Sequence, residues 1–196
     1  MEGRPYALDD TMGFFDIVAP LYERLHSDSE AQGRHIRERL GVTAAWRVLD
    51  VGGGTGRVAR VVAPGGNVVV LDPSAGMLRQ AEKHGGVRVV RGVAESVPFP
   101  DAGFDLVLMV DSLHHFADQP KALAEARRVL RPGGILYIEE FNPATLAGRA
   151  TALTERIFLQ RSRFHRPETL QRLVEAAGFA GVQVEKQGAA YTLRAS

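Results

Sequence analysis

The sequence predicts an α/β protein with a doubly wound, mostly parallel sheet of seven strands and helices on both faces. Three observations lead to this fold class. Short apolar runs alternate with segments of helical periodicity. A cluster of glycines at 52–56 follows the first apolar run and precedes a helical segment. The run at 104–110 is almost wholly apolar, as a strand buried on both faces should be.

The composition narrows the class of protein. Apolar residues make up 45% of the chain and charged residues 24%, as in ordinary globular proteins. The net charge of +1 gives no reason to expect a nucleic-acid partner. The absence of cysteine excludes disulfides, thiolate metal sites and a cysteine nucleophile. No apolar run approaches the ~20 residues of a membrane span, and the N-terminus has no signal-peptide core. We therefore expect a cytoplasmic protein without a metal site.

We expect a single domain over 1–196, because no linker, repeat or low-complexity tract divides the chain. Apolar side chains recur at helical spacing from 14 to 25, ahead of the first strand, and predict an added helix. The expected parts of the domain are an N-terminal helical cap (1–45), a core (46–141), a lid (142–166), and a C-terminal helix and hairpin (167–196).

Seven strands are expected from apolar runs bounded by turn residues. They lie at 46–51, 67–71, 87–90, 104–110, 135–141, 179–185 and 190–193. A tight turn at 131–134 leads into the fifth strand, and a turn at 186–188 joins the last two strands as a hairpin. The hairpin makes the end of the sheet antiparallel, whereas the intervening helices make the earlier strands parallel.

The expected helices begin and end at recognisable residues. Ser29 is a candidate cap for a helix that reaches Leu40, and Gly41 ends that helix. Further helices follow the glycine cluster, extend to about 84, and cover 122–130. Proline fits the first position of a helix, so the last helix begins at Pro167, and Gly178 ends it.

The glycine cluster and the acid before it indicate the kind of ligand. Gly54, Gly56 and Ala59 satisfy the G-x-G-x-x-G/A pattern of dinucleotide sites, so a Rossmann-like loop is expected. Asp50 ends the first strand two residues before Gly52, where a carboxylate would repel a pyrophosphate. The same carboxylate would attract an ammonium or a sulfonium, and S-adenosylmethionine (SAM) carries both.

The stretch Val-Leu-Asp-Val-Gly-Gly-Gly-Thr-Gly at 48–56 resembles motif I of the class I SAM-dependent methyltransferases. Phe-Asp-Leu-Val at 104–107 and His-His-Phe at 114–116 also resemble the family pattern. The closest likeness is to the ubiquinone/menaquinone-biosynthesis-type small-molecule branch, from about 14 to the C-terminus. The resemblance implies SAM as cofactor, S-adenosylhomocysteine as product, and cofactor contacts from Asp50, Gly52, Gly53, Gly54 and Gly56.

A second acid is expected at the cofactor. Asp72 ends the second strand 20 residues after Gly52, which is the spacing of an acid that binds ribose hydroxyls. The alternative is that Asp72 caps the next helix, with Pro73 at its first helical position. If ribose binding is correct, Pro73 and Met77 supply apolar surface to the adenine, although Met77 also suits a core position.

The adenine and the open face of the cofactor involve three more residues. The family often carries an acid that accepts from the adenine amine, at the position of Val93 in this sequence. Here the adenine would depend on apolar walls and on the backbone of Val93 and Ala94. The resemblance places Tyr22, on the expected N-terminal helix, over the cofactor, and plain packing is the alternative.

The candidates for catalysis follow the fourth strand, because ligands bind at the carboxyl edge of such sheets. Asp111, His114 and His115 lie there, and Asp111 is also a candidate cofactor contact. An oxygen or carbon acid acceptor would need a base, for which Glu139 and Glu140 near the end of the fifth strand are further candidates. A purely structural role for either histidine is the alternative, and adjacent histidines make a poor metal pair.

The expected reaction is transfer of a methyl group from SAM to a small-molecule acceptor by in-line displacement, in which alignment does most of the work. Arginines within 142–166 are candidates to bind an anionic acceptor, and a solvated basic face is the alternative. Two other functions stay open. One is a non-catalytic SAM-binding regulatory or scaffold protein. The other, an NAD-binding oxidoreductase, is disfavoured because no lysine has a tyrosine four residues before it.

Overall fold

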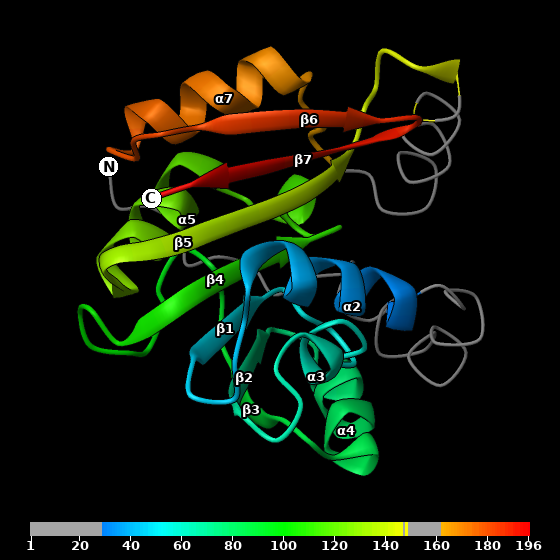
Figure 1. Cartoon of the computed structure of the whole chain (residues 1–196), viewed down its shortest axis with the longest axis vertical. Coiled ribbons are helices and arrows are strands. Elements are labelled where there is room, and N and C mark those ends of the chain that lie inside the picture. Colours follow the sequence, from blue (N-terminus) through cyan, green and yellow to red (C-terminus); the bar gives the residue numbers. More distant parts are fainter. Residues whose placement is uncertain (1–28, 147, 149–161) are drawn as a thin grey trace, which may run out of the picture.

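The computed structural model describes residues 29–146, 148 and 162–196. These residues form a seven-stranded sheet with the strand order β3-β2-β1-β4-β5-β7-β6 (Figure 1). The strands are β1 (Arg47–Val51), β2 (Asn67–Asp72), β3 (Arg88–Arg91), β4 (Phe104–Val110), β5 (Leu130–Phe141), β6 (Gln183–Gln187) and β7 (Ala190–Ala195). The helices in the described ranges are α2 (Ser29–Leu40), α3 (Ala59–Val62), α4 (Ala75–His84), the 3₁₀ helix η1 (Leu113–His115), α5 (Gln119–Val129) and α7 (Pro167–Ala176).

The direction of the strands creates a reversal at β1. Neighbouring strands from β3 through β5 are parallel, whereas β7 runs antiparallel to both β5 and β6. From β1 the chain builds outward to β2 and β3, and then returns to β4 on the other side of β1. Ligands bind outside the carboxyl ends of the strands at such a reversal. The expected Rossmann-like sheet with its antiparallel hairpin is confirmed.

Helices cover both faces of the sheet, as expected (Figure 1). Val48 and Leu106 belong to a core cluster with residues of α2, α3 and α4 on one face. Leu49 and Val107, the next residues along the same strands, pack with α5 and α7 on the other face. All four side chains are fully buried. The alternation of side chains along each strand therefore feeds two apolar cores, one on each side of the sheet.

The turn expected before the fifth strand lies within β5 instead. Phe104 pairs with Leu130 and Leu106 pairs with Ile135, so the residues between them bulge out of the β4–β5 register. One glycine of this bulge takes φ +74°, a left-handed conformation that glycine adopts without strain. β5 already pairs with β4 before the bulge, so the strand starts earlier than the turn residues suggest. A local run of turn residues does not show whether the chain before it pairs with another strand.

Among the other boundaries that differ from expectation, two have a clear structural cause. Ser74 is the N-cap of α4, with its hydroxyl accepting from Met77 N at 3.1 Å, so Pro73 precedes the helix rather than starting it. The sixth strand begins at Gln183 rather than 179, because Phe179 is buried in the core beside α5 and α7. Sequence patterns assign an apolar residue near a strand to that strand, even when the residue belongs to the loop before it.

Several expectations concern residues outside the described ranges. The helix expected at 14–25, which includes Tyr22, lies there, as does the stretch 149–161 of the expected lid. Within the described ranges α2 ends at Leu40 and α7 begins at Pro167, as expected. No helix of the described ranges is both long enough and apolar enough to cross a membrane.

Candidate active site

The loop after β1 is built around the buried carboxyl of Asp50. Gly52 N donates a hydrogen bond to Leu71 O at 2.7 Å, which ties the loop to β2. Gly53 lies directly against Asp50, since a Cβ at this glycine would be 2.3 Å from Oδ2 of the carboxyl. No side chain fits there, so the close approach of the carboxyl requires glycine. The loop backbone and Asp50 therefore form one unit at the reversal of the sheet.

The surroundings of Asp50 favour its protonated form. The residue is 3% exposed, and burial raises the pKa of its carboxyl to about 7. Arg57 lowers this pKa and Asp72 raises it further, but burial is the largest influence. A cation that binds beside Asp50 would stabilise the ionised carboxyl, as hydration stabilises a carboxylate that is exposed to solvent. The electrostatics thus favour a cationic ligand beside the loop, while the contact itself stays a prediction.

Asp72, at the end of β2, joins the loop to the following helix. Its Oδ2 accepts from Gly54 N at 2.9 Å, and its Oδ1 accepts from Ser74 N at 2.8 Å. A carboxylate oxygen can accept more than one hydrogen bond, so both oxygens retain capacity for ribose hydroxyls. The alternative that Asp72 caps the next helix with Pro73 at its first position is wrong, because Ser74 is the cap. Ribose binding stays a prediction.

The residues expected at the adenine are apolar and mostly buried. Met77 is 3% exposed, and its Sδ lies 3.8 Å from where a Cβ on Gly54 would be. Pro73 is partly exposed, and its carbonyl accepts from an arginine of β3 at 3.0 Å. Val93 is partly exposed in the loop after β3, and its neighbour Ala94 is buried. Met77 therefore lies beside the glycine loop, and the adenine contacts of all four stay predictions.

Two residues of the loop complete its local structure. Gly56 N donates to Gly53 O at 2.9 Å, which closes the turn before α3. Thr55, between them, is 1% exposed, and its hydroxyl has no hydrogen-bond partner among the described residues. Buried hydroxyls normally have a partner, so this one has unused capacity at the loop. Thr55 could not be singled out from sequence alone, because a hydroxyl within a glycine cluster has no pattern of its own.

Arg57 is a site residue that sequence reasoning missed. Its guanidinium contacts Asp111 Oδ2 at 3.2 Å, Ser29 Oγ at 2.8 Å and Gln32 Oε1 at 3.2 Å. The side chain of Arg57 is 10% exposed, so water screens the electrostatic attraction of this ion pair less than that of a surface pair. Arg57 therefore connects the end of the glycine loop to α2 and to the end of β4. Its position directly after motif I was the available signal.

Asp111 ends β4 in an unusual backbone conformation. Its φ of +50° is rare for a residue with a side chain, and such geometry is often found at functional sites. Burial raises the pKa of its carboxyl to about 7; Glu140 and Glu139 raise it further, whereas Arg57 lowers it. Asp111 therefore shares the electrostatic character of Asp50, one strand away across the reversal.

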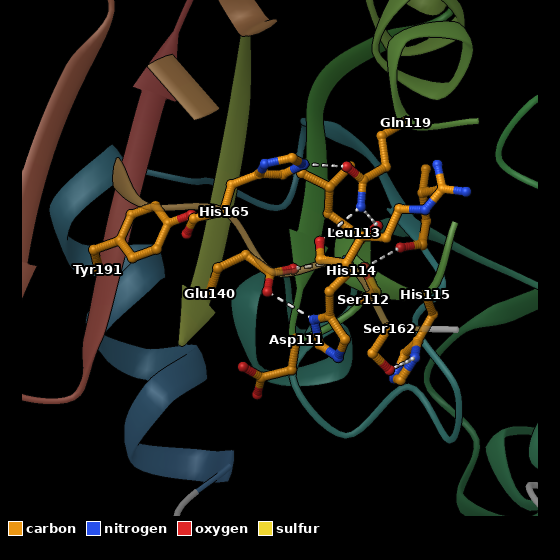
Figure 2. Close-up of polar contacts among 12 residues, drawn as sticks. Asp111, Ser112, Leu113, His114, His115, Gln119, Glu140, Ser162, His165 and Tyr191 are labelled. Atoms are coloured by element: carbon orange, nitrogen blue, oxygen red, sulfur yellow. Dashed lines mark hydrogen bonds and ion pairs between the residues drawn. The ribbon is translucent and has the colours of Figure 1, made fainter. Parts of the chain in front are cut away.

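His114 forms a buried pair with Glu140 of β5 (Figure 2). His114 Nδ1 lies 2.7 Å from Glu140 Oε2, and the backbone N of the same histidine donates to Oε1 at 3.3 Å. The two side chains are 1% and 4% exposed. The position of Glu140 within an apolar strand gave no hint of this pairing, because the contact depends on where η1 lies beside β5.

The segment Ser162–His165, called the strap below, lies across η1 (Figure 2). Its backbone bonds to η1, with Arg163 N donating to the carbonyl of His114 at 2.8 Å. Gln119 of α5 is the centre of the contact: its Nε2 donates to Arg163 O at 3.0 Å, and its Oε1 accepts from His165 Nε2 at 2.5 Å. Phe164 stacks on the ring of His114 at 4.2 Å. The strap is the end of the expected lid, and its contacts were missed from sequence.

The remaining catalytic candidates have other surroundings. His115 Nδ1 lies 3.4 Å from Ser162 Oγ in the strap. Glu139 points to the opposite face of the sheet from Glu140, and accepts from Tyr137 OH at 3.1 Å and from Gln32 Nε2 at 2.9 Å. Within the described ranges no group of three or more metal-ligating side chains lies together. The structure therefore brings Asp111, His114 and Glu140 together at the carboxyl edge, whereas the side chain of Glu139 bonds to Tyr137 and to Gln32 of α2.

The fold and the site define a class of protein. The strand order 3-2-1-4-5-7-6 combines with a glycine loop after β1 and with acids at the ends of β1 and β2. An acid in the loop favours a cation over a pyrophosphate. This combination is that of a Rossmann-like, SAM-dependent methyltransferase.

Comparisons with known proteins agree. A family model described as a methyltransferase domain matches residues 49–138. The demethylmenaquinone methyltransferase of Thermus thermophilus is 36% identical over 202 residues, which cover 85% of this chain and 91% of that protein. The ubiquinone/menaquinone biosynthesis C-methyltransferase of Hahella chejuensis is 39% identical over 148 residues, which cover 67% of this chain and 59% of that protein.

A solved structure matches over nearly its whole length. It is a SAM-dependent methyltransferase from Thermotoga maritima, described as a possible histamine N-methyltransferase. The TM-score is 0.80 at 27% identity, and the match covers 95% of this chain and 99% of that one. The chain belongs to the class I SAM-dependent methyltransferases, and its relatives include the ubiquinone and menaquinone enzymes named above.

Proposed function

We propose that the chain transfers a methyl group from SAM to a small-molecule acceptor by in-line displacement. One observation carries the proposal: a buried carboxyl, Asp50, lies against Gly53 in the loop at the reversal of the sheet. Its burial makes the ionised carboxyl dependent on a nearby positive charge. Bound SAM supplies that charge, and it carries a methyl group on its sulfonium. Transfer of the methyl group leaves a neutral thioether.

The proposed binding roles follow the elements. Asp50 binds the cationic part of SAM beside the loop glycines, and Asp72 accepts from the ribose hydroxyls through lone pairs that its backbone bonds leave available. Met77 and the backbone at 93–94 border the adenine, and Tyr22 covers the cofactor. Asp111 lies between the cofactor and the acceptor, where Arg57 holds its carboxyl.

The proposed acceptor site lies at the carboxyl ends of β4 and β5, next to Asp111 and His114. Placing the acceptor in line with the methyl group can supply several kcal/mol of the barrier reduction, since the sulfonium needs no activation. The names of the relatives favour a quinone precursor as acceptor, whereas the name of the Thermotoga maritima structure favours an amine. Asp111, His114 and His115 are the proposed acids and bases for an acceptor that must lose a proton.

Calorimetric titration of the full chain with SAM and, separately, with NAD tests the cofactor assignment. We expect micromolar binding of SAM and no binding of NAD. A screen of quinols, phenols and amines then follows S-adenosylhomocysteine release, and turnover of one class identifies the acceptor. Binding of NAD, or of neither ligand, would contradict the proposal. Binding of SAM without turnover of any acceptor class would favour the non-catalytic alternative.

A further inference from the structure

One of the proposed bases has a partner that can orient it. Glu140 bonds to His114 twice, through Nδ1 at 2.7 Å and through the backbone N at 3.3 Å. Two bonds from one carboxylate fix both the backbone of η1 and the rotation of the imidazole ring. The pair lies on neighbouring elements, with Glu140 on β5 and His114 in η1 (Figure 2).

The partner also determines which ring nitrogen carries the proton. An ionised carboxylate only accepts hydrogen bonds, so Nδ1 must be the donor toward Glu140. In a neutral imidazole one nitrogen carries hydrogen and the other carries a lone pair. With hydrogen on Nδ1, the lone pair of neutral His114 lies on Nε2, on the side of the ring away from Glu140. A base oriented by a third group is the arrangement that general-base catalysis requires.

We infer that His114 is the catalytic base of the proposed methyl transfer, that Glu140 is its positioning residue, and that the acceptor is therefore a protic nucleophile with an O–H or acidic C–H. This inference rests on the proposed function. Nε2 takes the proton of the acceptor, the freed electron pair forms the bond to the methyl carbon, and the electrons of the carbon–sulfur bond leave with sulfur. The products are the methylated acceptor, the neutral thioether and one proton on His114.

The contacts of two other candidates differ from this arrangement. Burial raises the pKa of the Asp111 carboxyl to about 7, but its Oδ2 lies 3.2 Å from the guanidinium of Arg57, so protonation of Asp111 would weaken that ion pair. His115 Nδ1 lies 3.4 Å from the hydroxyl of Ser162, and a hydroxyl can donate or accept and so does not fix a tautomer. The structure thus distinguishes two adjacent histidines that the sequence leaves equivalent.

Covering groups keep the pair away from water. The His114 side chain is 1% exposed, and the ring of Phe164 stacks on it at 19°. Exclusion of water strengthens the hydrogen bond to Glu140. Within the described residues, the ionisable groups that influence the pair or lie in the strap beside it include Asp111, His115, Arg163, His165 and Tyr191.

The tautomer can be measured without any acceptor. Nitrogen-15 NMR of the full chain, with His114 signals assigned by their loss in His114→Gln, distinguishes a protonated from an unprotonated ring nitrogen. In the neutral wild-type ring we expect hydrogen on Nδ1 and a lone pair on Nε2. Glu140→Leu removes the acceptor and should let the proton move to Nε2, whereas Glu140→Gln retains one oxygen and should preserve the tautomer.

Glu139→Leu is the matched control, because it removes the neighbouring carboxylate from the other face of the sheet. The His114 tautomer should not change in this variant. A proton on Nε2 in the wild-type neutral ring overturns the inference. So does an Nδ1–H tautomer that persists in folded Glu140→Leu, as judged by circular dichroism. These results do not depend on SAM, so they separate failure of this inference from failure of the proposed function.

Kinetics test the role in the reaction, using the acceptor that the screen identifies. In His114→Gln and Glu140→Leu we expect kcat to fall by about 100-fold or more, which is typical for loss of a general base. The SAM Kd should change little, and Glu140→Gln should recover part of kcat. The wild-type rate should rise with pH along a limb that His114→Gln lacks. Turnover confined to an aprotic acceptor, or an unchanged kcat in Glu140→Leu, overturns the inference.

Discussion

At the scale of single residues, burial of Asp50 has two opposite effects: it destabilises the ionised carboxyl in the unliganded protein, and it favours binding of a cation. The pKa of its carboxyl is raised to about 7, so near neutral pH the unliganded protein holds an acid in a place where its charge is poorly solvated. A cation that binds beside it would remove that penalty. The same burial that disfavours the free site therefore adds to the selectivity for a positively charged ligand.

The affinity for SAM should depend on pH because of this carboxyl. Below pH 7 Asp50 is mainly protonated, so binding of a cation must release a proton. The Kd should rise as the pH falls from about 7 to about 5.5, by at most about tenfold per pH unit for one coupled proton. Titration calorimetry measures this dependence, and Asp50→Asn should bind weakly with a flatter profile. A Kd for the wild type that is constant over this range would contradict the assignment.

Loss of the acid at the end of β2 should weaken SAM binding. Asp72→Ala removes the proposed ribose bonds, worth about 1.5–3 kcal/mol, and so should raise the Kd at least tenfold. Asp72→Asn keeps one acceptor oxygen and should have an intermediate Kd. Calorimetry measures both, with Asp101→Ala as a control because Asp101 is an exposed acid far from the loop in sequence. Equal affinity in wild type and Asp72→Ala would refute the ribose assignment.

Site residues were predictable when their signal was local. Asp50 and Gly53 belong to one recognisable motif, and the structure shows why position 53 must be glycine. Glu140 and Arg57 escaped notice as partners, because their contacts join residues that are 26 and 54 positions apart. A motif records the order of residues along one loop, whereas an ion pair between two elements depends on how those elements pack.

At the scale of elements, the side chain of Gln119 links the strap to η1. Gln119 bonds to the strap at Arg163 O and His165 Nε2, and to Leu113 O of η1 at 2.9 Å. It is 3% exposed, so the loss of its bonds would leave buried polar groups without partners. The mobility of the strap near the proposed base therefore depends on this residue of α5.

Removal of these bonds should loosen the strap without unfolding the protein. In Gln119→Leu we expect amide hydrogen exchange at Arg163, whose N–H donates to the carbonyl of His114, to accelerate at least about tenfold. The lost bonds are each worth roughly 0.5–1.5 kcal/mol. Gln171→Leu is the control, since that glutamine makes only an exposed contact within α7. Unchanged exchange at Arg163 would show that Gln119 does not hold the strap.

The elements themselves were largely predictable, because their signals are local periodicity and end residues. β4 has the predicted bounds, α2 has the predicted end and α7 has the predicted start. The errors lie where tertiary contacts override local chemistry. β5 includes the Arg-Pro-Gly-Gly bulge because Leu130 already pairs with Phe104. Phe179 belongs to the core rather than to the sixth strand, because α5 and α7 bury it.

At the scale of the whole molecule, two buried acids influence the stability of the unliganded fold. The carboxyls of Asp50 and Asp111 both have a pKa raised to about 7, mainly by burial. In an unfolded chain they titrate near their ordinary value of about 3.9. Between these values the folded state binds more protons than the unfolded state. The free energy of unfolding contributed by these groups therefore falls as the pH rises from about 4 to about 7.

Removal of one ionisable group should reduce this dependence. Asp50→Asn should increase the stability of the unliganded protein near pH 8 relative to the wild type, on the order of 1–4 kcal/mol, and change it much less near pH 5. Denaturant unfolding at both pH values, with Asp101→Asn as an exposed control, measures the difference. An equal effect of Asp50→Asn at both pH values would show that burial of the charge is not its cause.

The sequence by itself determined the fold class, the glycine loop and the acids near the ends of β1 and β2. These depend on periodicity, on glycine conformations and on a short motif, all of which are local properties of the chain. Only the tertiary structure decided how the carboxyl edge of the sheet is arranged. It places Glu140 on the ring of His114, Arg57 on Asp111 and the strap over η1. Those contacts cross between elements, and their geometry follows from the packing of the two cores on either face of the sheet.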